Sequence, residues 1–111
     1  MPYDIILGPA FKRSIKALKK RFPSVKRDVE LAIEILLENP DIGSVIPGAS
    51  GVRKLRVRNS DLSRGKSGDY RMLYYIEDHQ NQRVYLLLLY AKSDRETVSL
   101  REIQALIEDL R

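Results

Sequence analysis

Cysteine is absent from this sequence, and histidine occurs once, at His79. The absence of cysteine excludes disulfides and thiolate metal sites, and it is compatible with a reducing cytoplasm. A single histidine also excludes a ribonuclease mechanism that needs a histidine pair. His79 lies in the polar segment Asp78–Gln82, which predicts a turn, and a turn histidine is more often solvated than catalytic.

Long hydrophobic runs are missing as well. No stretch reaches the roughly 20 apolar residues of a transmembrane helix, and residues 1–12 lack the basic and apolar regions of a secretory signal. No serine stands in the Gly-x-Ser-x-Gly context of a serine hydrolase. We therefore expect a soluble cytoplasmic protein that contacts no membrane and uses neither a metal nor a cofactor.

The chain is of ordinary globular composition. It has 111 residues, of which 43% are hydrophobic and 32% are charged. A chain of this length can bury roughly two thirds of the surface that its unfolded form exposes. Since the sequence shows neither an internal repeat nor a linker, we expect one domain over residues 1–111.

The first half of the sequence predicts a strand and two helices. The apolar run Tyr3–Leu7 is typical of a short strand, and Gly8-Pro9 after it is typical of a helix start. Two amphipathic patterns follow, interrupted at Phe22-Pro23-Ser24 and ended before Pro40. They predict a helical hairpin. The segment Asp41–Gly51 is rich in Gly, Ser and Pro, and it predicts a loop.

The second half predicts three strands and a helix. Val52–Arg58 alternates, and Tyr70–Glu77 and Arg83–Ala91 form a hairpin whose second strand is apolar enough to be covered on both faces. Ser99 and Glu102 have the spacing of a capping box and begin the last helix. The expected fold class is α+β: an N-terminal strand, a helical hairpin, an antiparallel-rich twisted sheet of about four strands and a C-terminal helix.

Positive charge is concentrated in residues 53–71. This segment holds seven Lys or Arg and two Asp, so that it carries +5, the formal net charge of the whole protein. Strand alternation places Lys54, Arg56 and Arg58 on one face and Leu55 and Val57 on the other. Three cations on one strand face repel one another unless an anion binds there, and RNA is the first candidate.

Gly65-Lys66-Ser67-Gly68 resembles the end of a phosphate-binding P-loop. The earlier glycine of that motif is missing, and a strand rather than a helix follows, so a nucleotide-binding P-loop is not expected. Two interpretations remain open. The loop can offer Lys66 and backbone N–H groups to a nucleic-acid phosphate, or it is a solvated hairpin loop.

The segments RKLRVR, GKSGDYRMLYYI and YLLLLYAKS, with the capped final helix, resemble in this order the RelE/ParE superfamily of type II toxins. The similarity is closest to the RelE/HigB branch, and it covers nearly the whole chain, with FKRSIKAL as the first helix. It implies a toxin that cleaves translated mRNA on the ribosome without a metal ion, inhibits translation and arrests growth. It also implies neutralisation by a cognate antitoxin, expected to be a small helix-turn-helix DNA-binding protein.

The resemblance also implies the site residues. The basic pair of the first strand after the helices corresponds to Lys54 and Arg56, the arginine of the next strand to Arg71, and the lysine near the end of the last strand to Lys92. These four are the expected catalytic residues. The expected RNA-binding residues are Arg53, Arg58, Arg64 and Lys66.

After Lys92 the sequence departs from the RelE pattern, which continues with an arginine and then a tyrosine. Here those places hold Ser93 and a non-aromatic residue near Ser99. This departure argues against base stacking or acid catalysis by such a tyrosine, and it resembles HigB-like members with fewer groups.

RNA cleavage by its own 2′-OH needs a base, stabilisation of the phosphoryl charge and protonation of the leaving oxygen. Arg71, helped by Arg56, suits the second task because a guanidinium stays charged and offers a fork of donors. Lys54 is a candidate base, since neighbouring cations favour loss of its proton. Lys92 is a candidate donor to the leaving oxygen or a substrate contact. The sequence does not decide which lysine is base and which is acid.

Two other functions stay open. ParE-like members of the superfamily act on DNA gyrase, although they lack the RNA-cutting set that Lys54, Arg56 and Arg71 represent here. A basic face of this kind can also belong to a non-catalytic module that only binds RNA or its antitoxin.

Overall fold

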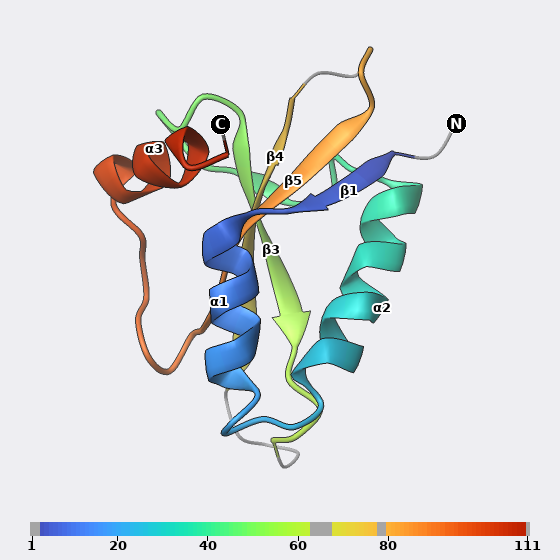
Figure 1. The fold of residues 1–111 in the computed structure, drawn as a ribbon, viewed down its shortest axis with the longest axis vertical. Coiled ribbons are helices and arrows are strands. Elements are labelled where there is room, and N and C mark those ends of the chain that lie inside the picture. Colours follow the sequence, from blue (N-terminus) through green and yellow to red (C-terminus); the bar gives the residue numbers. More distant parts are fainter. Residues whose placement is uncertain (1–2, 63–67, 78–79, 111) are drawn as a thin grey trace.

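A computed structural model describes residues 3–62, 68–77 and 80–110 of the chain. These residues form a single α+β unit, in which two helices follow the first strand and a third helix follows four further strands (Figure 1). The elements are β1 (Asp4–Leu7), α1 (Pro9–Leu18), α2 (Val25–Glu38), β2 (Ser44–Val45), β3 (Val52–Arg58), β4 (Asp69–Ile76), β5 (Arg83–Ala91) and α3 (Leu100–Glu108). None of the described helices is long and apolar enough to cross a membrane.

The five described strands form one sheet in the order β1-β5-β4-β3-β2. β1 pairs in parallel with β5, and the other neighbours are antiparallel. The predicted fold class is thus confirmed, with one more strand than the expected four. The addition is β2, whose two residues lie inside the segment predicted as a loop and pair with Arg53 and Lys54. Two residues are too few to give a strand period in the sequence.

The N-terminal strand joins the first helix directly at the sheet. Gly8 donates its N–H to the Leu86 carbonyl at 2.9 Å, and a Cβ at Gly8 would lie only 2.9 Å from that same oxygen. Glycine is therefore required here for close approach of the two backbones. Pro9 then occupies the first turn of α1, where no intrahelical N–H bond is lost.

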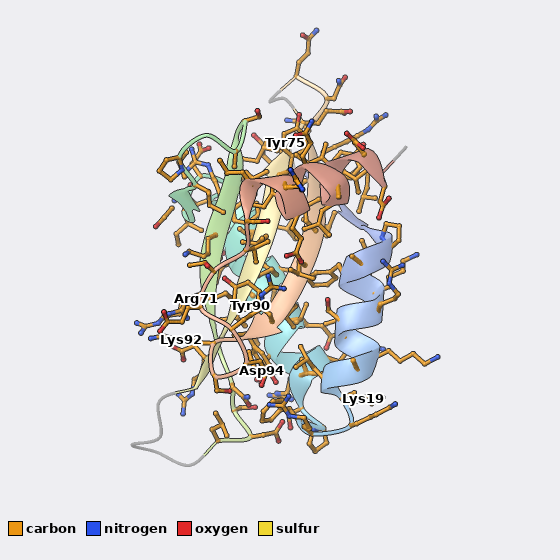
Figure 2. The ribbon with its side chains drawn as sticks, turned by 90° about the vertical axis from the view of Figure 1, so that its left-hand side faces the viewer. Lys19, Arg71, Tyr75, Tyr90, Lys92 and Asp94 are labelled. Atoms are coloured by element: carbon orange, nitrogen blue, oxygen red, sulfur yellow. The ribbon has the colours of Figure 1, made fainter. Side chains whose placement is uncertain are left out.

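Both faces of the sheet are covered, by different helices. One core lies under α1 and α2 and includes Phe11, Val25 and Leu36. The other lies under α3 and includes Ile103 and Leu106. Figure 2 shows α3 in front of the sheet and α2 behind it. The prediction that the last strand is covered on both faces is confirmed, since residues of β5 belong to each core.

A β-bulge interrupts the regular alternation of β5. Leu73 pairs with Leu88 and Tyr74 with Leu86, so that Leu87 is the extra residue. Leu87 and Leu88 consequently both pack in the core under α3, while Leu86 and Leu89 belong to the opposite core.

The start of α3 follows its predicted cap. The Ser99 hydroxyl accepts a hydrogen bond from the Glu102 N–H at 3.1 Å. Burial along this helix begins at Ile103, which is 2% exposed, whereas Leu100 at its start is 51% exposed.

The buried hydroxyl of Tyr74 holds the chain that leads into β2. It accepts a hydrogen bond from the Gly43 N–H at 2.8 Å and donates one to the Pro40 carbonyl at 2.6 Å. Burial raises the pKa of this hydroxyl. Arg53 closes the same loop by donating from Nη1 to the carbonyls of Gly43 at 2.8 Å and Asp41 at 2.9 Å.

We expect Tyr74→Phe to lower the free energy of unfolding by about 1–3 kcal/mol, because it leaves a buried N–H without its acceptor. Urea denaturation followed by circular dichroism measures this change. Tyr75→Phe is the control, since Tyr75 is only partly buried and packs its ring against Tyr85. Equal stability of the two variants would contradict a structural role for the Tyr74 hydroxyl.

Candidate functional site

Three strands place candidate side chains in one row across the sheet. Arg56 of β3 is opposite Arg71 of β4, and Arg71 is opposite Tyr90 of β5. Directly opposed residues of antiparallel strands have Cα atoms roughly 4.5–5.5 Å apart. The row lies on the same face as α3, since Tyr90 belongs to the core that α3 covers.

The two predicted catalytic lysines flank this row. Lys54 is two residues before Arg56, hence on the same face, and it is opposite Leu73. Lys92 begins the turn after β5, and its backbone N–H donates to the Asp69 carbonyl at 2.9 Å. Figure 2 shows Arg71, Tyr90 and Lys92 close together, below α3 and on the same side of the sheet. The structure thus brings all four predicted catalytic residues to one region.

The two arginines of the row differ in their freedom to move. The Arg71 side chain is 15% exposed, and its Nη1 lies 3.4 Å from the Tyr70 carbonyl. The Arg56 side chain is 70% exposed. Arg71 is therefore a fixed cation at the base of the site, whereas Arg56 can adjust to a bound group.

Asp69 lies between the two arginines, and sequence reasoning missed its role. One of its carboxylate oxygens is 2.6 Å from Arg56 Nε and 3.8 Å from Arg71 Nη1. Like charges opposed across a sheet are unfavourable, and this carboxylate offsets their repulsion. The sequence signal that could have revealed it is its position two residues before Arg71, which places both side chains on the same strand face.

The predicted RNA-binding residues are not all on this face. Arg58 is exposed and shares the face of Lys54 and Arg56 by alternation. Arg53 lies on the opposite face, where it bonds the loop carbonyls described above and stands 3.5 Å from Asp41 Oδ1. Its guanidinium is thus occupied in holding β2. Arg64, Lys66 and His79 lie outside the described residues.

Tyr90 is a second member of the site that the sequence did not reveal, because it ends a long apolar run. Its side chain is buried, and the Arg95 guanidinium lies over the ring, 5.6 Å from its centroid. Burial raises the pKa of the Tyr90 hydroxyl, and the charges of Arg71 and Arg95 oppose that increase. The sequence did hold one signal: Tyr90 is two residues before Lys92, and strand alternation places residues two apart on the same face.

Arg95 also connects the site to α3. Its two terminal nitrogens lie 2.7 and 3.1 Å from the carboxylate oxygens of Glu102, and its Nε donates to the Thr97 carbonyl at 3.2 Å. The connection between β5 and α3 is therefore held against the helix N-terminus by one planar guanidinium.

Acidic and histidine side chains do not assemble into a metal centre in the part of the chain that the structure describes. No group of three or more His, Cys, Asp or Glu there could hold a metal ion. The charged groups that gather are cations, with Asp69 as their counter-ion.

No protein-family model matches the sequence. Among solved structures, a double mutant of the E. coli toxin RelE, in the free state, is similar to this chain, with a TM-score of 0.60 and 20% sequence identity. The match covers 86% of this chain and 90% of the RelE chain. The two chains share the RelE-like fold. This agrees with the fold implied by the sequence resemblance.

We expect Asp69→Asn to strengthen binding of a short single-stranded RNA and to steepen its salt dependence. Loss of the carboxylate frees one guanidinium for one more phosphate, which adds roughly 0.7 to the magnitude of the slope of log K against log salt. Fluorescence anisotropy over a salt series measures both changes. Glu77→Gln is the matched control, because Glu77 follows the opposite end of β4 and pairs with Arg83. An unchanged slope would contradict the role given to Asp69.

Proposed function

We propose that this protein is the toxin of a type II toxin–antitoxin system and a ribosome-dependent endoribonuclease of the RelE/HigB type. The observation that carries the proposal is the convergence of Lys54, Arg56, Arg71 and Lys92 on one sheet face. Its RelE-like fold supports the same function. A cytoplasmic location follows from a target on translating ribosomes.

Arg71 is the principal phosphate clamp in this proposal. Its side chain is largely buried and fixed by the strand, so that little conformational freedom remains to be lost when a phosphoryl group binds. Arg56, opposite it, supplies a second guanidinium. Charge that develops on the non-bridging oxygens during attack by the 2′-OH is then stabilised by two permanent cations.

The two lysines stand on either side of that clamp. Lys54 precedes Arg56 on β3, and Lys92 follows β5 beside the end of β4 that carries Asp69. In-line displacement places the attacking and leaving oxygens on opposite sides of the phosphorus. A lysine on each side suits removal of one proton and delivery of another, without fixing which lysine performs which step.

The proposed partners are the translating ribosome with its mRNA and a cognate antitoxin, a small helix-turn-helix DNA-binding protein. The described surface near Arg71 offers Arg56, Arg58 and Lys92 to solvent. An antitoxin that covers this face with acidic groups would occupy the positions that mRNA phosphates need.

We expect Arg71→Ala to reduce mRNA cleavage at least about 100-fold, as does removal of one donor to a developing oxyanion. Arg71→Lys should recover only a small part, because an ammonium lacks the planar fork. The assay is cleavage of mRNA in the A site of programmed ribosomes, with growth arrest on expression without antitoxin as the second measurement. Arg83→Ala is the control, an exposed arginine at the start of β5.

Three outcomes would count against the proposal. A folded Arg71→Ala variant that still cleaves mRNA would remove Arg71 from the site. Ribosome and RNA binding by the wild-type protein with no cut mRNA would identify a binding module. A DNA-damage response with intact mRNA would identify a gyrase inhibitor.

A further inference from the structure

A small pocket opens beside the arginine row, on the face of the sheet that carries α3. It has a volume of about 110 Å³. It is lined by Ile46, Lys54, Leu73, Tyr90, Thr97 and Val98. Resting on the proposed function, we infer that this pocket binds a single-ring nucleobase, a pyrimidine, of the RNA whose phosphate Arg56 and Arg71 hold.

The size of the pocket fits one ring. An engineered protein cavity of about 150 Å³ accepts benzene, whereas one water occupies about 30 Å³ of liquid. The pocket is smaller than that cavity but open to solvent, so a ring of six atoms can enter it in part, and it suits such a ring better than the fused rings of a purine. The ring would replace water against the apolar side chains of Ile46, Leu73 and Val98, which gives the pocket a preference for a flat, largely apolar body.

The polar groups of the pocket match the edge of a pyrimidine. Of the residues that line the pocket, Lys54 carries a donor only, whereas Thr97 and Tyr90 each carry a hydroxyl that can donate and accept. Uracil and cytosine each carry a ring carbonyl that a lysine can bind. A purely apolar guest would leave these groups without partners, which is costly in a partly buried site.

The position of the pocket links it to the phosphate site. Lys54 and Leu73 form one cross-strand pair, and Arg56 and Arg71 form the next pair on the same face. Two residues along a strand span roughly 6.8 Å. Tyr90 belongs to both places, since it is opposite Arg71 and also lines the pocket. A nucleotide bound through its phosphate at the arginines can therefore direct its base toward Lys54.

The outer wall of the pocket is held in place before any ligand binds. Thr97 and Val98 come from the connection between β5 and α3, which Arg95 fixes through the Thr97 carbonyl and Glu102. Ile46 comes from the chain between β2 and β3, where its N–H donates to the Val52 carbonyl at 3.0 Å. A wall fixed in this way can select a base by shape, because binding does not have to order this part of the chain at a cost in conformational entropy.

The test compares binding of three short homopolymers of equal length: oligouridine, oligoadenosine and an abasic ribose–phosphate chain. We expect the wild-type protein to bind oligouridine roughly tenfold more tightly than the abasic chain, within the range measured for base contacts, and more tightly than oligoadenosine. Val98→Phe fills the pocket and should reduce oligouridine binding to the abasic level, with the salt slope unchanged. Anisotropy measures all three affinities without ribosomes.

Two variants keep this test decisive. Thr97→Val keeps the shape of an exposed wall residue and should lose part of the uridine preference even if Val98→Phe misfolds. Val45→Phe is the control, an exposed apolar residue of β2 outside the pocket. Equal wild-type binding of oligouridine and the abasic chain would overturn the inference, as would an unchanged preference in folded Val98→Phe. Uridine preference without ribosomal cleavage would uphold the pocket and refute the endoribonuclease instead.

Discussion

The opposition of Arg56 and Arg71 across β3 and β4 is the interaction on which the site depends. An antiparallel ladder fixes this pairing of the two residues, and a one-residue slip of register would turn every side chain of the strand over. The repulsion is tolerated because Val57, Tyr70 and Met72, on the reverse face of the same strands, are buried under the helical hairpin. Packing on one face of the sheet thus keeps the two arginines close together on the other face.

Asp69 shows how the free protein accommodates this charge. Its carboxylate occupies the space between the guanidinium groups, as a phosphate would, but it carries one charge and is covalently tied to β4. The contact with the exposed Arg56 contributes little to stability, as is usual for surface ion pairs. A polyanion can displace it at small cost. The basic face is therefore neutralised enough to fold and open enough to bind.

Strand period and capping signals predicted much of the molecule. Alternation placed Lys54, Arg56 and Arg58 together, and Ser99 with Glu102 located the start of α3. These signals are local. What they could not give was the order of strands, which depends on packing between distant segments. The parallel partnership of β1 with β5 was missed for that reason. The strand β2 was missed because its two residues are too few to show a strand period.

In the candidate site, too, the sequence predicted some features, and others depend on packing between distant segments. The four proposed catalytic residues came from a resemblance, and their common face is a result of tertiary structure. Arg53 shows the limit of composition, because its charge counts toward the basic segment while its guanidinium serves carbonyl groups on the other face. Tyr90 belongs to the site through its pairing with Arg71, and Arg95 belongs to it because the chain after β5 folds back over the sheet.

The bulge at Leu87 divides β5 into two segments, and the alternation of side chains between the two faces of the sheet shifts by one residue from the first segment to the second. From Arg83 to Leu86 it pairs with β1 on one side and continues to pair with β4 on the other, whereas from Leu88 to Ala91 it pairs with β4 beside the arginines. Uninterrupted counting by two from Leu86 would have turned Tyr90 toward the helical hairpin. One extra residue therefore lets the first half of β5 keep its pairing with the edge strand β1 while the second half keeps Tyr90 on the basic face. Partner contacts can change in either half without turning over the side chains of the other half.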